Sequence, residues 1–175
     1  EDERLFYTWT LQCHIDIAKA VWLDYCDCHM LDTIAREPLW RHLINYRCGT
    51  GHSVSFVGNV HEGPHALNSR NTTRMRPGMV VTDEPGVYET DLVGIRIENE
   101  LVCIHKADNQ YGTFLGFEPL TFVPIATSPI LPGVLDKDEL AWLNDYHRQV
   151  FAKLAPHLNA EERVWLAEKC ASIGC

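Results

Sequence analysis

The spacing of apolar residues changes twice along this chain, and these changes constrain its fold more than any other feature of its 175 residues. The N-terminal segment has the period of a helix, because one helical face collects Phe6, Trp9, Cys13, Ile17 and Ala20. Residues 30–46 predict a second helix, which Pro38 should kink or split. Residues 136–154 and 159–170 predict two further helices, the first capped by Asp136. Helices are therefore expected at both ends of the sequence.

The central part of the chain favours strands. β-Branched or apolar runs at residues 54–57 and 79–82 are bounded by Gly and Pro, and residues 94–104 alternate between apolar and charged side chains. Residues 62–78 are rich in Gly, Pro, Asn and Arg without periodicity, and are expected to form a surface loop. Helices, then strands, then helices predict an α+β fold with an antiparallel sheet, formed by residues 1–175 as a single domain.

The charge balance argues against several classes of partner. The formal net charge is −9, which disfavours a nucleic-acid surface and binding to an anionic membrane. The apolar runs are too short for a membrane-spanning helix, and the N-terminal residues do not resemble a secretory signal. We therefore expect a cytoplasmic protein that binds neither nucleic acid nor membrane.

The seven cysteines are expected to be mostly free thiols, because their number is odd and a chain of this length does not need disulfide bonds. The segment Cys26-Asp27-Cys28-His29 admits two interpretations. It could contribute to a zinc site, although a second ligand pair at suitable spacing is missing. Alternatively, it is a turn between two helices with incidental thiols, and this second interpretation is favoured.

Three short segments carry residue types that bind metals. They are Gly49-Thr50-Gly51-His52, Thr82-Asp83-Glu84-Pro85-Gly86 and Gly94-Ile95-Arg96-Ile97-Glu98-Asn99. The imidazole of His52 and the carboxylates of Glu84 and Glu98 form a reasonable ligand set for a divalent metal, which can activate water for hydrolysis. Arg96 lies two residues from Glu98 on one strand face and would stabilise its ionised form. The same alternation also fits a solvated strand face with an ordinary ion pair.

The same segments belong to a longer series of motifs. In order along the chain, the motifs occupy residues 49–52, 59–64, 77–86, 94–99 and 117–125. Together they resemble the Xaa-Pro aminopeptidases of the pita-bread metallopeptidase family M24, and the similarity covers nearly the whole chain. Asn59-Val60-His61-Glu62-Gly63-Pro64 and Phe117-Glu118-Pro119-Leu120-Thr121 favour this branch over the methionine aminopeptidases. The resemblance implies a curved antiparallel sheet with flanking helices.

The resemblance also implies a chemistry. Members of the family hold a dinuclear centre, commonly of manganese (zinc or cobalt being alternatives), and remove the residue that precedes proline at a peptide's N-terminus. Of the five ligands, the histidine would be His52 and the two glutamates Glu84 and Glu98. Glu84 would also shuttle a proton, while His61 would contact the peptide or the developing oxyanion, with Arg96 beside the metal ligands. Cys48 stands where the family usually has another active-site histidine, as a soft ligand or as the loss of a substrate contact.

Two aspartate ligands complete the centre in the family, and the resemblance places them upstream of this sequence together with the first strands of the sheet. Three functions are therefore open. The chain could be the C-terminal portion of a working Xaa-Pro aminopeptidase whose missing ligands lie upstream or on a second chain. It could be a catalytically silent pita-bread module that binds peptides or proteins. It could also be a structural or dimerisation fragment, and a homodimer is possible. By itself, the chain is expected to be inactive.

Overall fold

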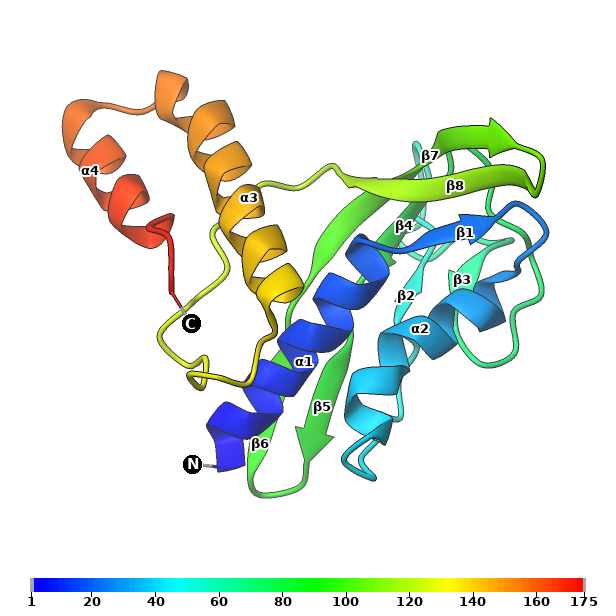
Figure 1. The fold of residues 1–175 in the computed structure, drawn as a ribbon, viewed down its shortest axis with the longest axis horizontal. Helices are drawn as coiled ribbons and strands as arrows, with labels where there is room; N and C mark the ends of the chain where they lie inside the picture. Colours follow the sequence, from blue (N-terminus) through cyan, green and yellow to red (C-terminus); the bar gives the residue numbers. More distant parts are fainter. Residues whose placement is uncertain (1, 175) are drawn as a thin grey trace. The chain divides into compact units, whose positions relative to one another are not determined.

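The computed structural model describes residues 2–174, which form two compact units. Unit 1 contains the chain up to Thr8 and again from Phe122 onward, and unit 2 contains Trp9–Thr121. Helix α1 (Asp2–Ala18) begins in unit 1 and continues into unit 2 (Figure 1). The candidate metal ligands all belong to unit 2.

Unit 2 is built on a four-stranded antiparallel sheet in the order β1-β8-β7-β4 (Figure 1). The strands are β1 (Val21–Leu23), β8 (Gly112–Pro119), β7 (Asn99–Asn109) and β4 (Val80–Asp83). Two small antiparallel pairs accompany the sheet: β2 (Gly51–His52) with β3 (Ala66–Leu67), and β5 (Gly86–Glu89) with β6 (Val93–Arg96). A single bridge between Ser53 and Val81 joins the end of β2 to β4.

The strands confirm part of the sequence prediction and correct the rest. The run at 79–82 forms β4 almost as predicted, whereas residues 54–57 form no strand. The alternating stretch 94–104 is not one strand, because the ladder is interrupted at Ile97 and Glu98, between β6 and β7. The sequence pattern alone cannot locate this break. Ile97 lies in the break but is buried, so the alternation of buried and exposed side chains continues through it.

Helix α2 (Cys28–Trp40) is shorter than predicted at its C-terminal end. Pro38 lies inside the helix, which continues for two more residues instead of splitting there. The chain leaves the helix where Leu43 adopts a left-handed backbone with φ of 60°, and the Ile44 N–H donates back to the carbonyl of Leu39. Closure of this kind satisfies a carbonyl at the helix end and stops propagation.

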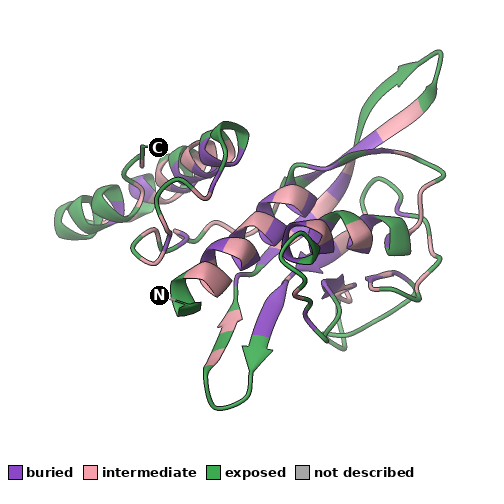
Figure 2. Cartoon of the chain, turned by 60° about the horizontal axis from the view of Figure 1, so that its bottom comes forward, coloured by how far each residue is buried: buried purple, intermediate pink, exposed green. Residues whose placement is uncertain are grey.

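Helix α1 is buried on more than the one face that its apolar pattern predicts. Its part in unit 2 contains completely buried Leu11, Ile15 and Ile17, but also the polar side chains of Thr10 and His14 (Figure 2). Buried polar groups require partners, so the partners of His14 bear directly on the site described below. The far end of the β7–β8 hairpin, by contrast, is exposed from His105 onward (Figure 2).

Two other expectations concern cysteines and membranes. The six cysteines within residues 2–174 are unbonded thiols, as expected, and Cys175 lies outside the described residues. Asp27 accepts a hydrogen bond from the Met30 N–H and caps α2. Because β1 precedes it, the 26–29 segment is a strand–helix turn and not the predicted helix–helix turn.

Among the described residues, no helix is both long and apolar enough to cross a membrane.

Unit 1 contains the predicted C-terminal helices. Helix α3 (Lys137–Leu154) is capped by Asp136, a short 3-10 helix η1 (Ala155–His157) follows, and α4 (Ala160–Lys169) is capped by Asn159. Both α-helices begin with a capping box, in which a glutamate three residues later returns a hydrogen bond to the backbone of the cap. These reciprocal bonds explain why the helix starts were predictable to within one residue.

Unit 1 should lose stability in mild acid through His147. This side chain is completely buried on α3, and its Nε2 accepts a hydrogen bond from the Ile125 N–H at 3.1 Å. Burial lowers the pKa of His147 below its ordinary value of 6.5. Since the folded state binds this proton less tightly than the unfolded state, the stabilisation is present above the unfolded pKa and is lost as pH falls through the folded one.

We expect the free energy of unfolding to fall between pH 7 and pH 5 more steeply in the wild type than in His147→Gln. Glutamine can still accept the Ile125 hydrogen bond but does not titrate. Urea unfolding at pH 7, 6 and 5 measures the difference, with the exposed His157→Gln as matched control. Equal slopes for the wild type and His147→Gln would show that His147 is not the group responsible.

Candidate functional site

The strand pairing brings the three predicted ligands to one end of the sheet. Asp83 at the end of β4 pairs with Asn99 at the start of β7, so the adjacent residues Glu84 and Glu98 leave the sheet at the same place. His52 ends β2, directly before the bridge that joins β2 to β4. Three segments that are separate in sequence are thus neighbours because of antiparallel register.

A close backbone approach fixes the position of His52. A Cβ atom on Gly51 would lie 1.7 Å from the carbonyl oxygen of Thr82, so only glycine fits there. The His52 N–H then donates to Thr82 Oγ1 at 2.9 Å, and the same hydroxyl donates to Glu84 Oε1 at 2.9 Å. Thr82 therefore connects the backbone of one candidate ligand to the side chain of another, a role that the sequence motif did not reveal.

The side chains form a connected polar cluster. His52 Nε2 lies 3.0 Å from Glu84 Oε1, and the rings of His52 and His61 have centroids 3.9 Å apart. Arg96 lies between the two glutamates, with NH1 3.6 Å from Glu84 Oε2 and Nε 3.3 Å from Glu98 Oε2. The structure therefore connects all five predicted site residues, directly or through Arg96.

The two carboxylates share one cation. Partial burial raises the pKa of Glu98, the negative charge of Glu84 raises it further, and Arg96 opposes both effects. Two carboxylates this closely coupled are stabilised by positive charge between them. Arg96 supplies that charge here, although its side chain is half exposed. A site of this kind would also accept a divalent cation if further ligands were present.

The described residues do not by themselves fit a complete metal centre. Histidine and carboxylate donors are the correct chemistry for manganese or zinc. However, no group of three or more His, Cys, Asp and Glu side chains within residues 2–174 is arranged to hold a metal ion. Glu98 contacts Arg96, while His52 and Glu84 contact each other. The assignment of His52, Glu84 and Glu98 as ligands therefore remains a prediction.

Cys48 lies close to the cluster as a thiol without a disulfide bond. Its Sγ donates to the carbonyl oxygen of Gly86 at 3.6 Å. Burial raises the pKa of the thiol, and a metal is bound by the thiolate. The two interpretations of Cys48, as a soft ligand and as a lost substrate contact, therefore both stay predictions.

A largely buried polar network involves the residues next to Glu84 and Glu98. His14 Nδ1 lies 3.0 Å from Asp83 Oδ2, and the Asn99 side-chain amide donates to His14 Nε2 at 3.2 Å. The hydroxyl of Thr121 in turn donates to Asn99 Oδ1 at 2.8 Å. Burial raises the pKa of Asp83 to about 6, against the opposing effect of His14.

Helix α1 is thereby attached to the two strand ends that carry Glu84 and Glu98. This network was missed from the sequence, although a histidine on the buried side of a helix was a signal that could have been followed.

Two family descriptions match this sequence. The description "Metallopeptidase family M24" matches residues 1–105, and "C-terminal region of peptidase_M24" matches residues 113–173. The chain belongs to metallopeptidase family M24. Its predicted membership is therefore confirmed.

Curated relatives match almost the whole chain. Aminopeptidase P1 of Lotus japonicus is 40% identical over 98% of this chain but 27% of its own length. The Xaa-Pro aminopeptidase app-1 of Caenorhabditis elegans is 39% identical over 97% of the chain and 29% of its own length. The chain thus spans less than a third of the length of these relatives.

Solved structures show the same fold. The X-prolyl aminopeptidase from Caenorhabditis elegans, described as a cytosolic enzyme with a di-nuclear active site, aligns with a TM-score of 0.92 and 37% identity, covering 99% of this chain and 29% of that chain. The prolidase from Pyrococcus furiosus aligns with a TM-score of 0.59 and 27% identity over 70% of this chain and 33% of its own. The pita-bread fold, with its antiparallel sheet and flanking helices, is therefore confirmed.

Proposed function

We propose that this chain is the C-terminal portion of the catalytic domain of a metal-dependent Xaa-Pro aminopeptidase. The observation that carries the proposal is the cluster of one imidazole, two carboxylates and one guanidinium at the joined ends of β4 and β7. The remaining carboxylate ligands and the first strands would come from upstream of residue 1 or from a second chain. The greater length of the relatives supports this part of the proposal.

The substrate would be a peptide with proline in second position, as the names of the relatives suggest. The metal would be divalent, with manganese before zinc or cobalt, and would supply Lewis acidity and an activated water. We place the protein in the cytosol, a location supported by the description of the Caenorhabditis elegans enzyme.

The chain's own residues would orient the groups that move protons. Glu84 Oε1 is held by His52 and Thr82, and Oε2 faces Arg96, so the carboxylate of a proton carrier is fixed at both oxygens. The ring of His61, which lies tilted beside that of His52, is exposed and available to donate to the peptide or to a developing oxyanion. Donors and acceptors that are already in position lower the activation free energy of hydrolysis, because the side chains need not rearrange during the reaction.

Cleavage of an Xaa-Pro-Xaa peptide tests the proposal. The 175-residue chain alone, supplied with manganese, is expected to release no N-terminal residue. A longer protein that includes the preceding segment of the same gene product should cleave the peptide in a metal-dependent manner. Glu84→Gln in that protein should reduce the rate by about 10²–10⁴-fold, the range for loss of a general acid–base group. The exposed Glu89→Gln on β5 is the matched control and should retain full activity.

Two outcomes would contradict the proposal. Metal-dependent cleavage by the isolated chain, abolished by His52→Ala, would show that residues 1–175 contain a sufficient site. A longer protein that binds the peptide without cleaving it would favour the silent binding module instead.

A further inference from the structure

A second region of unit 2 has the features of a binding site for an oxyanion. It is a cavity of about 590 Å³ between the C-terminal end of α2, the loop at residues 45–49 and the turn at residues 68–70. Its lining includes Arg36, Arg47 and Arg70 and contains no Asp or Glu, in a chain whose net charge is −9. A volume of this size suits a small molecule.

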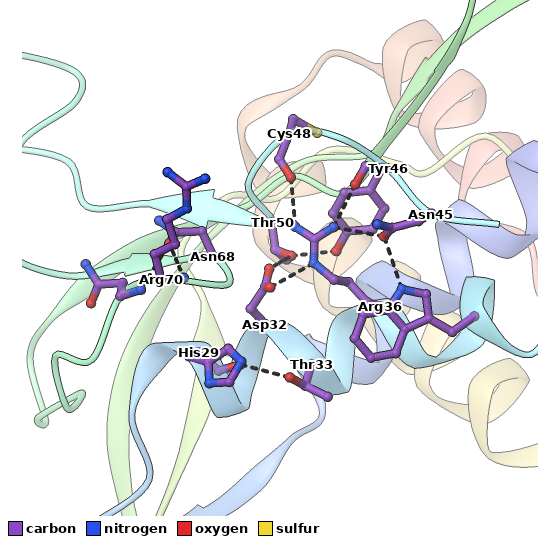
Figure 3. Close-up of polar contacts among 12 residues, drawn as sticks. His29, Asp32, Thr33, Arg36, Asn45, Tyr46, Cys48, Thr50, Asn68 and Arg70 are labelled. Atoms are coloured by element: carbon purple, nitrogen blue, oxygen red, sulfur yellow. Dashed lines mark hydrogen bonds and ion pairs between the residues drawn. The ribbon is translucent and has the colours of Figure 1, made fainter. Parts of the chain in front are cut away.

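Hydrogen bonds hold the walls of the cavity and occupy the amide oxygens of two asparagines. Asn45 Oδ1 accepts from Arg36 and from the Trp40 indole, and Asn68 Oδ1 accepts from the backbone N–H groups of Arg70 and Asn71 (Figure 3). In both amides the oxygen already accepts two hydrogen bonds. Among the described residues, no hydrogen bond engages the NH₂ group of either asparagine. Each amide therefore retains two donors and little accepting capacity.

The arginines divide into one structural residue and two that are available. Arg36 donates to Asp32, to the carbonyl of Tyr46 and to that of Cys48, so its guanidinium fixes the loop on either side of residue 47 (Figure 3). Arg47 and Arg70 are exposed, and no ion pair or hydrogen bond of either guanidinium occurs among the residues that the structure describes. The guanidinium groups of Arg47 and Arg70 therefore extend from backbone that hydrogen bonds already hold in place.

We propose that this cavity binds a small molecule through its carboxylate or phosphate group. Arg47 and Arg70 would supply charge-assisted, bidentate hydrogen bonds, and the amides of Asn45 and Asn68 would complete a lining that only donates. Preorganisation of the loop by Arg36 reduces the entropy that the protein loses on binding. None of the predicted metal ligands lines the cavity, although Cys48, which lies close to the candidate site, does.

Titration of the purified chain with inorganic phosphate and with acetate, at constant ionic strength, tests the proposal. Backbone amide resonances of residues 45–49 and 68–70 should shift along a saturable curve. Arg47→Gln combined with Arg70→Gln should weaken binding by at least about tenfold, as expected for the loss of charged hydrogen bonds. Saturation by phosphate alone, acetate alone or both supports the site and identifies which oxyanion it prefers.

Asn68→Asp is a second, sharper variant. Aspartate keeps the oxygen that accepts from the Arg70 and Asn71 N–H groups, so the turn is preserved. The substitution replaces the NH₂ donors of Asn68 by a negative charge, so anion binding should be abolished. The thermal unfolding midpoint measured without anion should stay unchanged.

The matched control removes two arginines elsewhere on the same unit. Arg74 and Arg76 line a cavity of about 330 Å³ that also contains Asp24, and both are exposed. Arg74→Gln with Arg76→Gln changes the net charge equally and should leave the anion affinity within about twofold of wild type. Shifts that rise linearly without saturation, or an equal loss in this control, would overturn the proposal and show only general charge attraction.

Discussion

Replacing His14 by alanine is expected to lower the free energy of unfolding by about 3–5 kcal/mol, the cost of leaving a buried charge without its partner. His14 and Asp83 are both completely buried, and their atoms approach to 3.0 Å. The variant also deprives the Asn99 amide of its acceptor. Chemical denaturation followed by far-ultraviolet circular dichroism measures the loss.

The matched control is a pair with the same chemistry at the surface. His105 Nε2 lies 2.9 Å from Asp108 Oδ2, but the two side chains are 49% and 68% exposed. His105→Ala should therefore cost far less than His14→Ala, because solvent screens the pair. Similar losses in His14→Ala and His105→Ala would show that burial does not determine the strength of the His14 contact.

The pH dependence of the His14→Ala defect has a defined sign. The pKa of Asp83 is raised from 3.8 to about 6 in the folded protein, so ionisation of this group destabilises the folded state as pH rises through that value. Without His14, the penalty for ionisation grows. The difference in unfolding free energy between wild type and His14→Ala should therefore be smaller at pH 5, where Asp83 holds its proton, than at pH 8.

The candidate ligands were predictable from the sequence because their motifs are local. The glycines and prolines around His52, Glu84 and Glu98 mark turns and strand ends, and the register of β4 and β7 then places the two glutamates together. The capping residues Asp136 and Asn159 likewise define their helices from a few neighbouring positions.

The buried support of the site was not predictable in the same way. His14 lies 69 residues before Asp83 and 85 before Asn99, so nothing in the local pattern indicates that the three side chains meet. The end of α2 was missed for a related reason, because the left-handed conformation of Leu43 is uncommon for a branched apolar residue. Tertiary context, not local propensity, selects both features.

Arg36→Leu is expected to have an effect as large as that of His14→Ala, for a similar physical reason. The Arg36 side chain is 8% exposed and that of Asp32 is 1% exposed, with Nε 2.7 Å from Oδ2. Loss of the guanidinium leaves the Asp32 charge unpaired and the carbonyls of Tyr46 and Cys48 without their donor. We expect a destabilisation of about 3–5 kcal/mol, measured by urea unfolding.

The same helix provides the control for this substitution. Arg41, the C-cap residue of α2, lies four residues after Glu37 and forms an ion pair with it, but their side chains are 66% and 45% exposed. Arg41→Leu should cost less than about 1 kcal/mol. The double variant Arg36→Leu with Asp32→Leu should recover part of the loss, because an apolar pair does not leave a buried charge. A double variant less stable than Arg36→Leu would contradict this explanation.

Arg36→Leu also connects stability to binding. Its hydrogen bonds hold the carbonyls on both sides of Arg47, so the loop should gain mobility even where the rest of the unit stays folded. Under conditions in which the variant is fully folded, phosphate affinity should fall although Arg47 and Arg70 are intact. Unchanged affinity would show that the order imposed by Arg36 serves stability alone, and that the two exposed arginines need no preorganised loop to bind an oxyanion.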